Sequence, residues 1–177
     1  MVKPSGFEHA VLFQCILYLI PVNIFLLGEG VAAGVQWVLF RYQQSYLGNS
    51  LIIFTKDLYY VNQEILTGKS AIAAEIAFIA TIFIVLATII LVIAWQKESP
   101  QWVKASAAMT MGSGCLYLVS DVLQYGIFFN GPSGFVIPIG VPVILGCGWW
   151  MYKMSYFEID KEELECAIPS DEKKSEN

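Results

Sequence analysis

Residues 71–95 read AIAAEIAFIATIFIVLATIILVIAW, and this segment decides the expected fold. Its one charged residue, Glu75, lies near the start. A helix needs roughly 20 apolar residues to cross the hydrocarbon core of a bilayer, which is about 30 Å thick. The chain of 177 residues is 56% hydrophobic with a mean hydropathy of +0.60, well above the range of a water-soluble domain. The sequence therefore predicts a membrane protein.

Three further apolar stretches accompany this segment, so we expect an all-α integral membrane protein, a four-transmembrane-helix bundle. The expected spans are residues 11–40, 71–95, 103–129 and 136–152. The first span contains Pro21 and several glycines, which membrane helices tolerate, and we expect one long, bent helix there. Between the first two spans, apolar residues recur every three or four positions over residues 49–67. That spacing predicts an amphipathic helix in the membrane interface.

The charge distribution divides the chain into a four-span membrane domain, residues 1–156, and an acidic soluble tail, residues 157–177. Residues 158–177 carry eight acidic residues and three lysines, which accounts for the net charge of −5. Such a tail would be repelled by nucleic acid phosphates, so we expect no nucleic acid partner. Four crossings put both termini on one side, and the lysines near the span ends favour the cytoplasm. The expected location is the cell membrane, multi-pass, with cytoplasmic termini.

A stripe of polar side chains marks the third span, and its members recur every three or four residues along one helix face. They are Ser106, Thr110, Ser113, Tyr117, Asp121 and Gln124. These groups cannot bond to lipid tails, so the stripe must face protein or water. Two interpretations stay open: a lined pathway or small polar ligand site, and close packing between helices. At mid-bilayer a carboxylate costs on the order of 2.5–3.5 kcal/mol, so Asp121 needs a cation, a proton or a hydrogen-bond donor.

Glu29 is the second carboxylate that could lie deep in the bundle. It is flanked by Gly28 and Gly30, which permit an unwound turn. Glu29 is buried if the first helix is continuous and lies at a loop edge if the helix breaks there. The candidate residues for binding a ligand or ion are Asp121, Glu29, Tyr117, Gln124, Ser113 and Thr110.

Catalytic and metal-binding motifs are missing from the sequence. The single histidine, His9, cannot form a bis-histidine haem site or an H-E-x-x-H zinc site. The four cysteines form no C-x-x-C pair. The order Gly112-Ser113-Gly114 does not match the G-x-S-x-G nucleophile motif. We therefore expect no enzyme activity, no catalytic residue, no metal and no cofactor.

Two main functions remain open at this point. The first is a non-catalytic subunit or scaffold of a larger membrane assembly. The alternative is an ion or proton channel or transporter component that uses intramembrane carboxylates, and a weaker alternative is a lipid- or quinone-binding membrane protein. A four-span bundle is too small to enclose a wide pore alone, so the expected partners are the lipid bilayer and either further copies of the chain or other membrane subunits.

Overall fold

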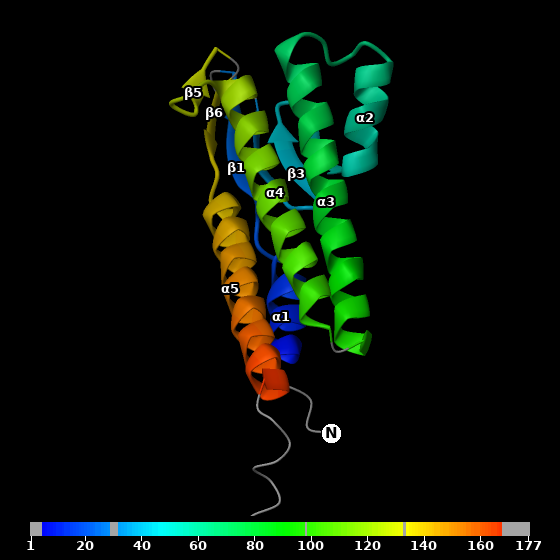
Figure 1. Cartoon of the computed structure of the whole chain (residues 1–177). Helices are drawn as coiled ribbons and strands as arrows, with labels where there is room; N and C mark the ends of the chain where they lie inside the picture. The colour runs from blue at the N-terminus through cyan, green and yellow to red at the C-terminus, as the bar shows by residue number, and fades with distance from the viewer. Residues whose placement is uncertain (1–4, 29–31, 98, 133, 168–177) are drawn as a thin grey trace, which may run out of the picture.

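The computed structural model describes residues 5–28, 32–97, 99–132 and 134–167, and it has a mixed α+β fold (Figure 1). The helices are α1 (Ser5–Ile16), α2 (Phe54–Asn62), α3 (Lys69–Lys97), α4 (Pro100–Tyr125) and α5 (Gly140–Ala167). The strands are β1 (Asn23–Leu27), β2 (Ala32–Gln36), β3 (Phe40–Ser45), β4 (Gly48–Ile53), β5 (Asn130–Gly131) and β6 (Gly134–Ile137). They form one six-stranded antiparallel sheet in the order β4-β3-β2-β1-β6-β5.

The sheet lies at one end of the molecule, behind α3 and α4 (Figure 1). The lower halves of α3 and α4 continue past it and pack with α1 and α5 at the other end. Between these regions lies a hydrophobic core that includes Leu17, Val22, Ile84 and Ile144, each at most 2% exposed.

The predicted four-span, all-α bundle is wrong, and so is the multi-pass membrane localisation that followed from it. The sheet takes up much of the first expected span and of the chain up to Ile53. Among the described residues, only the helix Lys69–Lys97 is both long enough and apolar enough to cross a membrane. The predicted subunit, channel and lipid- or quinone-binding functions all assumed a polytopic membrane protein, so these predictions are wrong as well.

Local backbone preferences explain why residues 11–40 do not form one helix. Helix α1 ends at Ile16, and Pro21 precedes β1, where its missing N–H cannot support a continuing helix. Strand β1 then alternates between buried and exposed side chains, as expected of a strand with one covered face. Gly34 lies opposite Phe25 in the register, and the Phe25 ring occupies the place of a Gly34 side chain. The glycine therefore allows the β1–β2 hairpin to close under this ring.

The other expected elements are shifted rather than absent. Helix α2 is shorter than the predicted amphipathic helix, because the first residues of that segment belong to β4. Helices α3 and α4 cover most of the second and third expected spans. Pro100 lies in the first turn of α4, where its missing N–H costs no helical hydrogen bond. Helix α5 begins at Gly140, after β6, and continues to Ala167, beyond the predicted domain boundary at residue 156. The last ten residues of the predicted tail lie outside the described residues.

Small residues set the spacing between α3 and α4. Three serine hydroxyls of α4 donate hydrogen bonds to alanine carbonyls of α3: Ser106 to Ala87 at 2.8 Å, Ser113 to Ala80 at 2.7 Å and Ser120 to Ala73 at 2.8 Å. Both the serines and the alanines recur every seven residues, the repeat at which two packed helices keep the same faces together. This serine–alanine ladder brings the two backbones close and fixes the register of α4 against α3.

Candidate functional site

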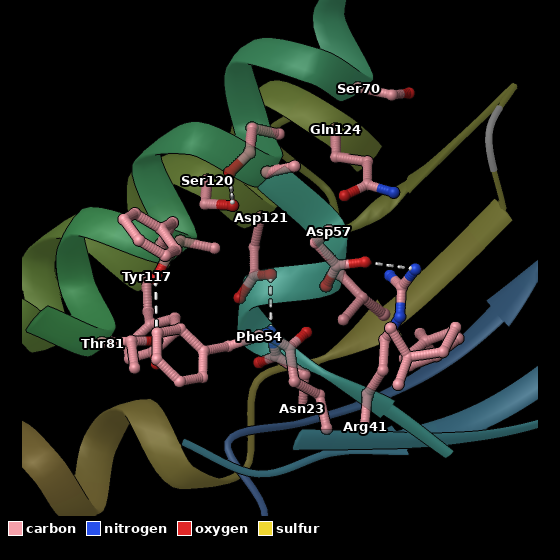
Figure 2. A pocket seen from close by; sticks show the side chains of 18 of the residues that line it. Asn23, Arg41, Phe54, Asp57, Ser70, Thr81, Tyr117, Ser120, Asp121 and Gln124 are labelled. Atoms are coloured by element: carbon pink, nitrogen blue, oxygen red, sulfur yellow. Dashed lines mark hydrogen bonds and ion pairs between the residues drawn. The ribbon is translucent and has the colours of Figure 1, made fainter. Parts of the chain in front are cut away.

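A cavity of about 60 Å³ lies between the inner face of the sheet and helices α2, α3 and α4. Figure 2 shows its polar side chains, which come from segments far apart in the sequence. They include Asn23, Arg41, Asp57, Tyr117, Asp121 and Gln124. The sheet register places Asn23 and Arg41 on the inner face, while α4 carries the last three residues.

Asp121 and Asn23 point toward one another across the cavity (Figure 2). The Asn23 Nδ2 group donates a hydrogen bond of 2.8 Å to Asp121 Oδ1. The two residues are 4% and 3% exposed, yet Asp121 Oδ2 and Asn23 Oδ1 have no hydrogen-bond partner within the protein. A buried polar atom left without a partner costs about 1–3 kcal/mol. Two such oxygens beside one cavity therefore indicate a place for water or a ligand.

Burial controls the charge of this carboxyl group. It raises the pKa of Asp121 to about 7, although the hydrogen bond from Asn23 acts in the opposite direction. Burial likewise raises the pKa of Tyr125 to about 12, with the Asp121 charge adding to the rise and Arg41 opposing it. Near neutral pH, Asp121 therefore exchanges between an ionised and a neutral form.

The other two charges of the cavity compensate each other. Arg41 on β3 and Asp57 on α2 form an ion pair, with 2.8 Å between Nη2 and Oδ1. Burial raises the pKa of Asp57, and the Arg41 charge partly offsets this rise. Because Arg41 and Asp57 neutralise each other, ionised Asp121 carries the uncompensated charge of the described lining.

The hydroxyl groups beside the carboxyl are held by structural hydrogen bonds. Tyr117 and Thr81 share a bond of 2.7 Å, and Thr81 Oγ1 also lies within 3.1 Å of the carbonyl oxygens of Ala77 and Val38. The best assignment has Tyr117 donating to Thr81, which in turn donates to a carbonyl. The Ser120 hydroxyl donates to the carbonyl of Ala73. These hydroxyls thus join α3, α4 and the loop before β3, and none of them is bonded to a carboxylate that could act as a base.

The structure divides the polar stripe of α4 into two parts. Tyr117, Asp121 and Gln124 line the cavity. Ser113 instead belongs to the serine–alanine ladder, and Thr110 Oγ1 lies 3.0 Å from the carbonyl of Ser106 and 3.3 Å from Gln14 Oε1. Packing between helices therefore accounts for Ser113 and Thr110. A role in ligand binding stays a prediction for Tyr117, Asp121 and Gln124. Glu29 lies outside the described residues.

Sequence reasoning missed Asn23, Arg41 and Asp57. Asn23 falls within the expected first span, residues 11–40, Arg41 directly follows that span, and Asp57 falls within the expected interfacial helix, residues 49–67. Asn23 lies 98 residues from Asp121 along the chain, and only the sheet brings the two together. An amide in the middle of a long apolar stretch is the available signal for Asn23, because a buried amide needs partners.

In the part of the chain that the structure describes, no group of three or more His, Cys, Asp or Glu residues could hold a metal ion. No protein-family model matches the chain, and comparison with curated proteins gives no significant match. The geometry of the cavity is therefore the basis for inferring a function.

Proposed function

We propose that the chain is a non-catalytic binding protein for a small monovalent cation, held in the cavity beside Asp121. The observation that carries this proposal is the pair of buried oxygens without partners, Asp121 Oδ2 and Asn23 Oδ1. A cation, or an ammonium group with its N–H donors, would satisfy both oxygens at once. Hydrogen bonds that involve a charged group contribute about 1.5–3 kcal/mol, more than those between neutral groups.

Charge and volume favour a small ligand with a single charge. Because Asp57 is paired with Arg41, a monovalent cation neutralises the site, whereas a divalent ion would leave an excess positive charge in a buried place. A water molecule requires about 10–15 Å³ of such volume, so 60 Å³ holds one ion with a few waters or an amine of a few heavy atoms. The shared chemistry is a compact cation, either an alkali ion or an ammonium group.

A titration of the purified protein at pH 8 tests this proposal. We expect methylammonium, ammonium or potassium chloride to give saturable binding by calorimetry, and tetramethylammonium chloride at equal ionic strength to give none. Tetramethylammonium has the same charge, but it is larger and has no N–H donors. Equal responses to methylammonium and tetramethylammonium would indicate general screening by salt and contradict a built site.

The cation-free protein should lose stability as the pH rises. The pKa of Asp121 is raised in the folded state to about 7 from 3.8, so between these values the folded state binds more protons than the unfolded state. The contribution of Asp121 to the free energy of unfolding is therefore largest below pH 4, and it is lost as the pH rises from about 4 to about 7. Urea denaturation at pH 5 and pH 8 measures the difference, which we expect to be on the order of 1–3 kcal/mol. A wild-type difference no larger than that of Asp121→Asn would contradict the assignment to this residue.

The outward face of α3 supports a second, separate proposal: we infer that lipid is the partner of this helix. Ile72, Ile79, Ile82, Leu86 and Ile89 are 37–52% exposed along one side of α3. The most apolar window of α3 has a mean hydropathy of 3.2 and is only 28% buried, whereas the core helix of a globular domain is mostly covered. This proposal concerns α3 alone.

Flotation with phosphatidylcholine vesicles checks the proposed lipid contact. We expect the wild-type protein to float with the vesicles and the double variant Ile79→Glu/Leu86→Glu to lose most of this binding, because each buried glutamate would have to be desolvated. Glu75→Gln lies on the same exposed side of the helix and should float at least as well as the wild type, because it removes a charge that lipid contact would otherwise have to desolvate. Equal flotation of the double variant and the wild type would exclude this face as the lipid contact.

A further inference from the structure

The outer face of the sheet is apolar across five neighbouring strands. Side chains of successive residues in a strand point to opposite faces of the sheet. Asn23, Phe25 and Arg41 point inward to the helices and the cavity, so their neighbours along the strands point outward. The register aligns the outward side chains in rows across the sheet. One row runs Leu51, Tyr42, Val35, Ile24 and Ile137.

This outer face is exposed, uncharged and large. Eight of its apolar residues are 37–62% exposed: Ile24, Leu26, Phe40, Tyr42, Leu51, Ile53, Phe135 and Ile137. The other outward positions of the described strands are Ala33, Val35, Gln44, Asn49 and Asn130, so none of these positions carries a charge. With roughly 200 Å² for a large apolar residue, the eight expose on the order of 700 Å². Monomeric proteins rarely expose contiguous apolar patches of more than a few hundred Å².

We propose that this outer sheet face packs against the same face of a second copy of the chain, sheet on sheet, in a two-fold symmetric dimer. The exposed apolar area is close to the roughly 800 Å² that each partner buries in a standard stable interface. Two-fold symmetry places a patch against itself, so a charged patch would meet like charges. A patch without charges avoids this repulsion, and two apolar sheet faces pack about 10 Å apart with interdigitated side chains.

The topology also places the dimer axis. Strands β2 and β1 are the middle pair of the sheet, so the greatest overlap of two copies has the axis near Ala33 and Leu26, which are paired across these strands. Ala33 of one copy then lies near Ala33 of the other. The β3–β4 turn, with Tyr46 80% exposed, lies beside this axis rather than on it, two residues past Gln44, the β3 partner of Ala33. The cavity opens on the inner side of the sheet, so the dimer and the proposed cation site are independent.

Sedimentation velocity tests the dimer with a matched pair of variants. Leu51 on the outer face and Ile65 between α2 and α3 are 62% and 65% exposed. We expect the wild type and Ile65→Glu to sediment as dimers at micromolar concentration, and Leu51→Glu to sediment as a monomer, with its dissociation constant raised at least 100-fold. Circular dichroism of the variants checks that the fold is retained.

Cross-linking gives a second result that does not depend on a destabilising variant. Under mild oxidation, Ala33→Cys should form a disulfide between two copies through residue 33, identified by mass spectrometry, and Tyr46→Cys should not. A wild-type monomer at all concentrations would overturn the proposal, as would a dimer unaffected by Leu51→Glu and without the 33–33 link. A monomer that binds phosphatidylcholine vesicles through Leu51 would assign this face to lipid and also overturn it.

Discussion

Replacing Asp121 with asparagine should weaken methylammonium binding at pH 8 by about 10- to 100-fold. The substitution removes the uncompensated charge of the cavity and nearly preserves the side-chain volume. Loss of a charge-assisted hydrogen bond costs about 1.5–3 kcal/mol, and each 1.4 kcal/mol corresponds to a tenfold change in affinity. Calorimetric titration of the wild type and the variant measures the difference directly.

We expect Asp121→Asn to lose cation binding without losing stability. The asparagine carbonyl can still accept the hydrogen bond from Asn23 Nδ2 that Asp121 Oδ1 accepts in the structure. Its new amide group could also donate to Asn23 Oδ1. Because a buried charge is removed, we expect Asp121→Asn to be at least as stable as the cation-free wild type at pH 8.

The matched control for Asp121→Asn is Glu75→Gln. It removes one negative charge from the exposed side of α3, so its affinity for methylammonium should stay within about twofold of the wild type, since exposed charges are screened by solvent and salt. Binding by Asp121→Asn within threefold of the wild type would show that the cation is held elsewhere.

Replacing Ala80 with leucine should destabilise the protein by about 2–4 kcal/mol. Ala80 is fully buried between α3 and α4, and its carbonyl accepts the hydrogen bond from Ser113. Extra methyl and methylene groups in a packed core cost about 1–3 kcal/mol, and loss of the hydrogen bond adds about 1 kcal/mol. Urea denaturation of the purified variant measures the sum.

Neighbouring variants show whether the close approach of α3 and α4 causes this loss. Ile79 precedes Ala80 and is 44% exposed, so Ile79→Leu should change the free energy of unfolding by less than about 0.5 kcal/mol. Ser113→Ala removes the hydrogen bond without adding volume and should cost about 1 kcal/mol. If Ala80→Leu cost no more than Ile79→Leu, the serine–alanine ladder would not set the helix spacing.

The long helices were predictable from sequence, whereas the sheet was missed for a physical reason. A continuous apolar run identifies α3 without any knowledge of its neighbours. Ile24 to Leu27 is also an apolar run, but a run this short fits a buried strand as well as a helix. Its boundaries at Pro21 and Gly28 are typical of strand ends. Counting apolar residues over the whole stretch concealed these boundaries and produced one long helix.

Part of the candidate site could be found in the same way. Asp121 was identified because a lone carboxylate on an apolar helix needs compensation wherever it is buried. Its partner could not be identified, because the pairing of Asn23 with Asp121 depends on how the sheet packs against α4. A signal for the tight helix pair is also present in the sequence: the alanines at 73, 80 and 87 and the serines at 106, 113 and 120 repeat every seven residues.

Nuclear magnetic resonance of the Asp121 carboxyl carbon tests the central claim most directly. In the absence of cation, this carboxyl should titrate near its pKa of about 7. A cation held against Oδ2 favours the ionised form, so saturating methylammonium should lower the midpoint by at least about one pH unit. A midpoint that methylammonium leaves unchanged, at a concentration that saturates binding, would contradict a cation site at Asp121.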